Sequence, residues 1–330
     1  MKRPARTPLG RPRPMGPAQT PTPREPARYR EVTRDGVELS LLRFAGDVRW
    51  DHPVLLTHGT FSNAQACEKL ASFLADHGFD CWIVELRGHG ESRAGEGRPD
   101  FQHLADFDVP AAIDAVRRWT GKPQAFLVGH SGGGLIFLMH LARNPERCHE
   151  VKGLVTLASQ ATEAGRTWGA RARIAGFAAM NNLLGYLPGP VLGVGPENEY
   201  RDVMNQWFRW NWSRRWLGRD GFDYAEALRR ITVPALCLAG TGDRFIAPLR
   251  GCQKLHDLLG STDKRFIACG KATGFAEDFD HARIIASRAA WQEIWPVILT
   301  WVSDRAGACP GSPVGPAGAT SAWRVDNRVR

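Results

Sequence analysis

Short apolar segments alternate with longer amphipathic segments along most of this chain, and this alternation limits the folds that it can adopt. An antiparallel hairpin is predicted first, at 29–33 and 37–44, around the turn dipeptide Asp35-Gly36. Apolar runs typical of buried strands then recur at 54–57, 81–84, 125–128, 154–157, 235–238 and 266–268. Helical periodicity occupies 64–77, 105–119, 132–143, 249–259 and 282–302. This order predicts an α/β fold in which helices cover both faces of a mostly parallel sheet.

One long interval interrupts the alternation of predicted strands and helices and suggests an inserted unit. Residues 160–228 are too many for an ordinary crossover connection. We expect them to form a helical cap between two parts of the core, 28–159 and 229–304. Residues 1–27 and 305–330 are rich in small residues, proline and arginine and poor in large apolar ones. They cannot bury enough surface to offset chain entropy, so disordered tails are predicted at both ends.

Charge and cysteine content exclude several classes of protein. The formal charge is +9, but much of it lies in the tails and in 201–219, so nucleic-acid binding is not favoured. The seven cysteines are scattered without a CxxC pair, which argues against a disulfide scaffold and a zinc cluster. No run approaches the roughly 18 apolar residues of a membrane span. The basic N-terminus precedes no apolar signal segment, so a cytoplasmic location is expected.

The pentapeptide Gly129-His130-Ser131-Gly132-Gly133 stands between a predicted strand and a predicted helix. An abrupt strand-to-helix turn holds its serine in a strained conformation with the hydroxyl exposed, and the glycines allow close backbone approach. This pattern predicts Ser131 as a nucleophile. The alternative is a glycine-rich turn in which the serine only caps the helix, which would leave the acidic and basic residues described below unexplained.

Acyl transfer also needs N–H donors for the negative charge that develops on the carbonyl oxygen. Gly132, at the start of the predicted helix, supplies one N–H group. The second is expected from Thr60 in the loop His58-Gly59-Thr60-Phe61, which follows the predicted strand 54–57. The side chain of His58 is interpreted as loop packing.

An acid and a base follow in the order that this topology requires, serine then aspartate then histidine. Asp243 comes after the apolar run 235–238, at the edge of the sheet where ligands bind in α/β folds. Its alternative role is a helix cap. Of the two later histidines, His256 lies within a predicted helix, whereas His281 lies in a loop before the last one. We expect His281 to act as the base, with Asp243 orienting it, and no metal or organic cofactor.

The predicted cap contains an unusual mixture of aromatic residues and arginines from Trp207 to Trp216. Such a segment could line an apolar pocket, contact a lipid surface, or form the small core of the cap itself. Stacking on nucleic-acid bases is not favoured. The substrate pocket is expected to include Phe61, His130, Trp207 and Trp210.

These residues resemble the α/β-hydrolase superfamily over roughly residues 30 to 303. The run Glu85-Leu86-Arg87-Gly88-His89-Gly90-Glu91-Ser92 is similar to an arginine-glycine-histidine-glycine loop frequent in that superfamily. The run Asp106-Phe107-Asp108-Val109-Pro110-Ala111-Ala112-Ile113-Asp114, with Thr120-Gly121, resembles the acid lipase branch, which includes gastric and lysosomal lipases. That resemblance implies hydrolysis of lipid or sterol esters under an aromatic lid.

The expected function is therefore hydrolysis of carboxylic esters with a hydrophobic or lipid-like acyl group. A cofactor-free haloperoxidase or perhydrolase, or an acyltransferase, would use the same three side chains. Epoxide hydrolases and dehalogenases need a carboxylate where Ser131 stands. A non-catalytic ligand-binding module is less favoured, because it would normally lack one member of the triad. The expected partner is a small ester or lipid, with contact to a lipid surface as a further interpretation, and the sequence leaves the oligomeric state open.

Overall fold

The computed structural model describes residues 25–309, and its centre is an eight-stranded sheet in the order β1-β2-β4-β3-β5-β6-β9-β10. Neighbouring strands are parallel except in the pairs β1–β2 and β2–β4. The predicted fold class is confirmed. The strands are β1 (Ala27–Val32), β2 (Glu38–Phe44), β3 (Val54–Thr57), β4 (Cys81–Glu85), β5 (Ala125–His130), β6 (Val151–Leu157), β9 (Ala235–Gly240) and β10 (Lys264–Cys269).

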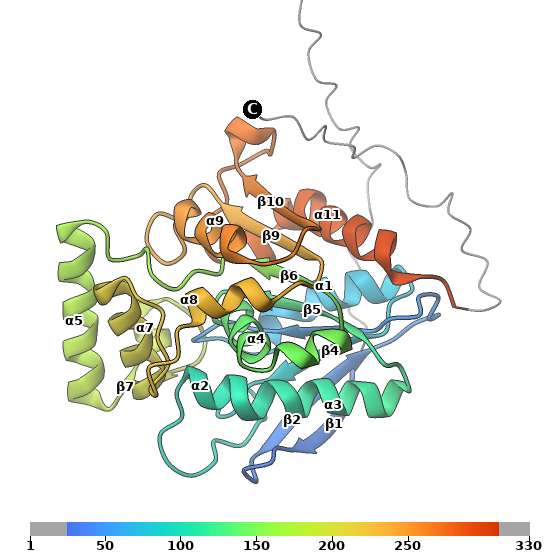
Figure 1. Ribbon diagram of the computed structural model, residues 1–330, viewed down its shortest axis with the longest axis horizontal. Helices are drawn as coiled ribbons and strands as arrows, with labels where there is room; N and C mark the ends of the chain where they lie inside the picture. The colour runs from blue at the N-terminus through green and yellow to red at the C-terminus, as the bar shows by residue number, and fades with distance from the viewer. Residues whose placement is uncertain (1–24, 310–330) are drawn as a thin grey trace, which may run out of the picture.

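Helices cover both faces of this sheet (Figure 1). The pair α3 and α4 lies on one face, and the pair α1 and α11 lies on the other. A π-helical turn, Leu104–Asp108, leads directly into α3. The helices outside residues 160–228 are α1 (Gln65–Asp76), α2 (Phe101–His103), α3 (Val109–Thr120), α4 (Gly132–Arg143), α9 (Leu249–Leu258), α10 (Arg283–Ala286) and α11 (Arg288–Ala306). The short helix α8 (Tyr224–Ala227) lies at the end of that interval.

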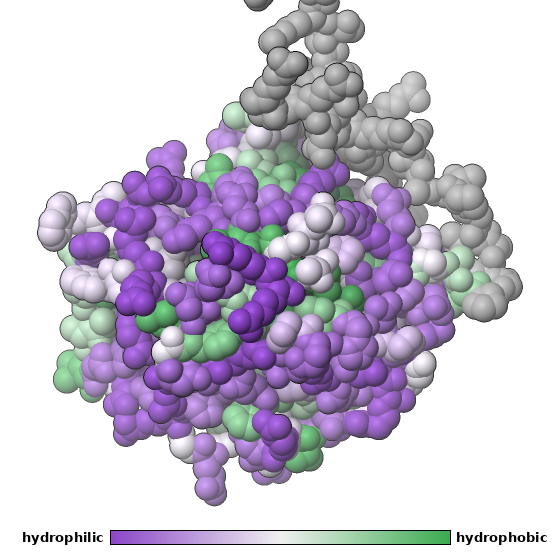
Figure 2. Space-filling view, viewed as in Figure 1, coloured by the Kyte–Doolittle hydropathy of each residue, from purple (hydrophilic) through white to green (hydrophobic). Residues whose placement is uncertain are grey.

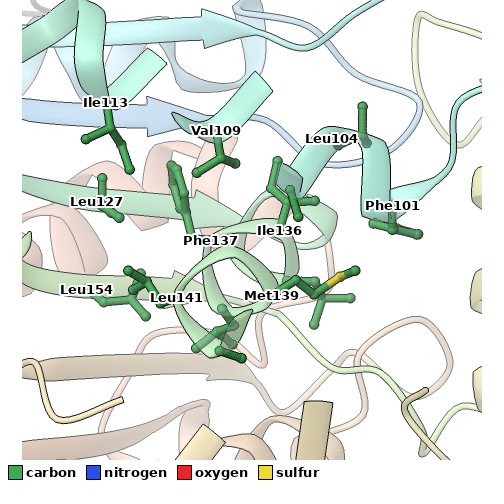
Figure 3. Packing of buried hydrophobic residues seen from close by; sticks show 14 of the residues in the cluster. Phe101, Leu104, Val109, Ile113, Leu127, Ile136, Phe137, Met139, Leu141 and Leu154 are labelled. Atoms are coloured by element: carbon green, nitrogen blue, oxygen red, sulfur yellow. The ribbon is translucent and has the colours of Figure 1, made fainter. Parts of the chain in front are cut away.

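The alternation of side chains along the central strands produces one core layer on each face. Leu55 and Leu127 belong to the layer under α3 and α4, whereas their neighbours Leu56 and Val128 belong to the layer under α1 and α11. Successive side chains of a strand point to opposite faces of the sheet, so a strand that is apolar throughout is buried on both faces. Figure 3 shows Phe137 of α4 among residues of α3 and β5 in the first of these layers.

The chain leaves the main sheet after β6 and returns to it at β9, and the part between, residues 160–228, is called the cap below. Its helices α5 (Trp168–Leu184) and α7 (Arg201–Ser213) pack against each other at one end of the molecule, at the left in Figure 1. A short helix α6 (Gly189–Leu192) and an antiparallel pair, β7 (Tyr186–Leu187) and β8 (Glu199–Tyr200), connect them. The cap therefore adds no strand to the main sheet.

The last helix differs from the sequence-based prediction, which placed one helix at 282–302. The backbone of Ser287 is extended, with φ −80° and ψ 161°, and its hydroxyl accepts a hydrogen bond from Ala290 N–H at 3.0 Å. A serine in this geometry is an N-cap, so α10 ends and α11 begins there.

Both predicted tail boundaries were also wrong by a few residues. Ala27 is already part of β1, and α11 continues to Ala306 because that residue is buried against the core. The Cys309 N–H group then donates to Arg49 O at 2.8 Å, which fixes the chain after the helix. The remainder of the predicted tails, 1–24 and 310–330, lies outside the described residues.

The helices between residues 25 and 309 include none that is long and apolar enough to cross a bilayer. The cytoplasmic location stays a prediction.

Candidate active site

The turn from β5 into α4 places Ser131 at the carboxyl end of a central strand. Its backbone has φ 53° and ψ −119°, a region that non-glycine residues rarely occupy. The neighbouring glycines make this turn possible. A Cβ atom on Gly129 would lie 2.4 Å from Gly134 N, and one on Gly133 would lie 2.5 Å from His58 O. The backbone thus crosses itself too closely for any side chain at these two positions, and this is the reason that the turn needs glycine.

Replacing Gly129 by alanine is therefore expected to destabilise the protein by about 3 kcal/mol, because the new methyl group meets backbone atoms that cannot move aside. Urea denaturation followed by circular dichroism measures this difference. The matched control is Gly176→Ala in α5, where an added Cβ meets nothing within 4 Å. The free energy of unfolding of Gly176→Ala should rise by roughly 0.5–1 kcal/mol, because alanine is a better helix former than glycine. Equal stability of the two variants would contradict the explanation.

The structure brings the three predicted triad side chains together at this edge of the sheet. Asp243 lies in the loop after β9, and His281 lies in the loop between β10 and α10. The hydroxyl of Ser131 is 2.8 Å from His281 Nε2, in position to donate to it. On the other side of the ring, Nδ1 of His281 is 2.5 Å from Asp243 Oδ2. The remaining oxygen, Oδ1, accepts from Ile246 N–H at 3.0 Å, so both carboxylate oxygens are engaged.

The charge of Asp243 sets the tautomer of His281. Burial raises the pKa of this carboxyl group, but its hydrogen bond to His281 and the charge of that ring outweigh burial, and the pKa falls below its ordinary value. An ionised carboxylate only accepts hydrogen bonds, so it requires a proton on Nδ1. The lone pair of Nε2 then faces the Ser131 hydroxyl, which is the arrangement needed to remove its proton.

The two predicted oxyanion donors lie next to each other. A Cβ atom on Gly132 would be 3.4 Å from the Thr60 amide nitrogen, and one on Gly59 would be 2.8 Å from Ser131 Cβ. Gly132 is the first residue of α4, so its N–H group has no partner within the helix. Among residues 25–309, neither amide donates to another backbone group. Two free N–H groups are thus available close to the Ser131 hydroxyl.

An apolar cavity of about 200 Å³ opens above Ser131 and His281. The core and the cap both line it, and Phe61 and Trp207 are among the lining residues, as the sequence predicts. From the core come Phe101, Leu135, Ala158, Phe245 and Ile246, and from the cap come Phe177, Leu187, Leu192, Val194, Met204 and Phe208. Two larger hollows elsewhere on the surface contain no triad residue.

Two predicted pocket residues do not line this cavity. Trp210 is 1% exposed and packs on Phe101 and Trp216, with ring centroids 5.1 and 6.1 Å apart. It follows Phe208 by two positions, so it projects from nearly the opposite side of α7, into the core. His130 lies beneath the triad, where its Nε2 donates to the carbonyl oxygen of His281 at 2.8 Å. Burial, with a smaller contribution from His281, lowers the pKa of His130 to about 3, so this ring is neutral.

Most of the cap residues that line the cavity were not predicted from the sequence. Met204, Trp207 and Phe208 are spaced i, i+3, i+4, the pattern of one face of a helix. This spacing was visible in the sequence and could have separated them from Trp210. The contributions of Leu187, Leu192 and Val194 had no such signal, because they lie in short irregular connections of the cap.

A buried pair of opposite charges joins the cap to the core beside this site. Nε2 of His89 lies 3.4 Å from Glu199 Oε2, and both side chains are 2% exposed. Burial lowers the pKa of His89, but the negative charges of Glu199 and of Glu197 outweigh it and raise the pKa to about 9. His58 faces the same ring, with 5.4 Å between centroids. Burial and the neighbouring His89 lower the pKa of His58 to about 3, so it carries no competing charge at neutral pH.

This pair is expected to make stability fall at alkaline pH. The pKa of His89 is higher in the folded protein than its ordinary value of 6.5, so its protonation stabilises the fold. That contribution is complete below about pH 6.5 and is lost as the pH rises through about 9. Thermal unfolding between pH 7 and 10 measures the loss, and the variant His89→Gln should lack this part of the decline. An identical alkaline decline in both proteins would contradict the prediction.

The part of the chain that the structure describes contains no group of three or more His, Cys, Asp or Glu side chains placed to hold a metal ion. Independence from cofactors stays a prediction.

Known proteins resemble this chain in part of its sequence and in its fold. The model of the alpha/beta hydrolase fold matches residues 52–175, which include Thr60 and Ser131. The chain has the α/β-hydrolase fold. Human gastric triacylglycerol lipase is 32% identical to this chain over 155 residues, and a tear acid lipase-like protein of Mesocricetus auratus is also 32% identical over 155 residues. Each match covers 41% of this chain and 39% of the relative, so the chain spans about two fifths of their length. The resemblance to the acid lipases is confirmed.

Solved structures resemble this chain over most of its length. An esterase from Thermogutta terrifontis superimposes with a TM-score of 0.59 at 16% identity, covering 85% of this chain and 100% of the esterase. A monoacylglycerol lipase from Paleococcus ferrophilus gives a TM-score of 0.56 at 19% identity, covering 80% of this chain and 99% of the lipase. At such identities the likeness concerns the fold alone.

Proposed function

We propose that this protein is a serine hydrolase that cleaves carboxylic esters with a hydrophobic acyl group. The observation that carries the proposal is the continuous line of hydrogen-bonding atoms from Asp243 through His281 to Ser131, with separations of 2.5 and 2.8 Å. The 2.8 Å between Ser131 Oγ and His281 Nε2 lies within the hydrogen-bond reach that proton transfer from a nucleophile to its base requires.

The reaction follows from this arrangement. Ser131 Oγ attacks the ester carbonyl carbon while its proton passes to His281 Nε2, and Asp243 stabilises the imidazolium that forms. The N–H groups of Thr60 and Gly132 bind the oxyanion. When the carbonyl forms again, the alcohol leaves with the proton from His281, and the acyl group stays on Ser131. Water then attacks the acyl enzyme with His281 as base, and the carboxylic acid is released.

The cavity supports a hydrophobic acyl group as substrate. Its lining is largely aromatic and aliphatic, and its volume of about 200 Å³ is modest for a ligand site, since pockets for drug-sized ligands are typically about 300–1,000 Å³. Relatives named gastric triacylglycerol lipase support a lipid-like ester.

The outer surface of the cap supports contact with a lipid surface. Of the nine large hydrophobic side chains that are exposed in residues 25–309, seven lie between 168 and 212, and Trp168, Leu183 and Val191 are each more than four fifths exposed. Figure 2 shows apolar residues at the left edge of the molecule, over the end of α5 next to β7. Val194 is both exposed and part of the cavity lining, so this apolar surface reaches the mouth of the site. A patch of this kind favours binding at a lipid–water interface.

A panel of p-nitrophenyl esters from acetate to palmitate tests the substrate class. Burial of a methylene group is worth about 0.8 kcal/mol, so kcat/KM is expected to rise by up to about fourfold for each carbon until the acyl chain fills the cavity. Phe208→Ala should move the maximum to longer chains, because Phe208 lines the cavity. Trp212→Ala, on the same helix but half exposed and outside the cavity lining, is the matched control and should leave the maximum in place. A flat profile, or an equal shift in both variants, would contradict an acyl pocket here.

A further inference from the structure

The loop that carries Thr60 is held from outside the core, by the cap. The Phe61 N–H group donates to Glu199 Oε2 at 3.2 Å, and the Phe61 carbonyl oxygen accepts from Glu197 N–H at 3.0 Å. Both partners belong to the part of the cap that ends in β8. Phe61 itself has φ 62°, an unfavourable value for a residue with a Cβ, so this conformation needs contacts that hold it.

The carboxylate of Glu199 is buried and has few partners. Its Oε2 faces Phe61 N–H and, at 3.4 Å, the imidazole of His89, while Oε1 accepts from the N–H of Tyr200 at 2.9 Å. A carboxylate is costly to bury without such compensation. The short two-stranded pairing of β7 and β8 would not by itself require an acidic residue here. The charge of Glu199 is thus directed at the loop 58–61 and at His89, both in the core.

Close packing limits how far this segment can move. A Cβ on Gly195 would lie 2.1 Å from Phe61 O, and one on Gly88 would lie 2.0 Å from the hydroxyl oxygen of Tyr200. The side chain of Glu197 accepts from Asn63 Nδ2 at 2.7 Å, two residues beyond Phe61. The cap and the loop therefore cannot shift independently of each other.

We propose that Glu199 is a positioning residue for the oxyanion hole: its buried carboxylate fixes the Phe61 amide and thereby the adjacent Thr60 N–H, so the cap completes the site that binds the transition state. The peptide groups on either side of the Thr60 Cα share that atom, so anchoring Phe61 restricts rotation of the Thr60 N–H. An oxyanion donor acts only when it points at the developing charge, and an error of about 1 Å can cost on the order of 10²-fold in rate. The inference rests on the proposed function.

The variants Glu199→Ala and Glu199→Gln test it. Alanine removes the acceptor of Phe61 N–H, whereas glutamine keeps an acceptor oxygen and loses only the charge. The order of kcat for p-nitrophenyl butyrate should be wild type, then Glu199→Gln, then Glu199→Ala, and the alanine variant should lose roughly 10- to 100-fold. KM should change little, because the ground-state ester does not carry the oxyanion charge.

Two inhibitors separate positioning from a merely structural role. A trifluoromethyl ketone with a butyl chain forms a tetrahedral adduct whose oxygen occupies the oxyanion hole, and its affinity should fall by the same factor as kcat. The corresponding ether, which forms no adduct, should bind all variants alike. The matched control is Glu163→Gln, because Glu163 is a buried cap carboxylate whose charged partners include Lys254 and Arg214 rather than the loop 58–61. It should keep the kcat of the wild type.

The results for the Glu199 variants distinguish failure of this inference from failure of the proposed function. If Glu199→Ala keeps wild-type kcat, or if the ether loses affinity as much as the ketone does, the inference is overturned and the proposed function stands. If Glu199→Ala does not fold, the comparison of Glu199→Gln with Glu163→Gln decides. Wild-type protein that turns over no ester and is not labelled at Ser131 would overturn the proposed function instead.

Discussion

Replacing Ser131 by alanine is expected to lower kcat/KM for p-nitrophenyl esters by a factor on the order of 10⁴ or more, because Ser131 carries the only hydroxyl in residues 25–309 that is hydrogen-bonded to His281. The melting temperature should hardly change, since the hydroxyl contributes one hydrogen bond, to His281. Steady-state kinetics with a calorimetric scan measures both. Substantial ester turnover by this variant would place the nucleophile elsewhere.

Ser131→Gly is the informative companion to this variant. It should be equally inactive, yet more stable than Ser131→Ala by about 1–2 kcal/mol. Glycine adopts the φ of 53° at position 131 without steric cost, whereas alanine keeps the strain. Equal melting temperatures would mean that the elbow is not strained.

Replacing Asp243 by asparagine should have the second largest effect, a loss of roughly 10³- to 10⁴-fold in kcat. The corresponding substitution in a serine protease triad lowers kcat by about 10⁴-fold. An amide NH₂ group opposite Nδ1 favours the other tautomer of His281, which turns an N–H group toward Ser131 and leaves no base.

A second histidine–aspartate pair in the chain provides the control for that substitution. Nδ1 of His256 lies 2.9 Å from Asp257 Oδ1, a contact of the same kind on the surface of α9. Asp257→Asn should leave kcat unchanged, because the His256–Asp257 pair is not part of the triad. A comparable loss in both variants would indicate a general effect on folding and would remove the special role of Asp243.

The sequence predicted the main sheet and singled out the three side chains that the structure brings together, because both depend on local signals. Glycines flanking Ser131, the apolar run before Asp243 and the loop position of His281 can all be read within a few residues. The C-terminal edge of a parallel sheet then brings together side chains that are far apart in the chain. The exact bounds of α4, Gly132–Arg143, also follow from its local pattern.

Contacts between the cap and the core could not be predicted in the same way. The spacing along α7 separates the face of Trp207 from that of Trp210, but it does not say which face meets the core and which meets the cavity. Glu199 reads as an ordinary surface carboxylate, because its partners Phe61 and His89 lie more than one hundred positions away. Such pairings depend on how the cap docks, for which the sequence has no periodic signal.

Labelling with a fluorophosphonate tests the central claim most directly. Intact mass spectrometry and peptide mapping of the folded protein should find one phosphonyl group, on Ser131, and labelling of His281→Ala should be slower by a factor on the order of 10² or more, because the base is missing. A folded protein that takes up no label, or takes it up at another residue, would contradict the account.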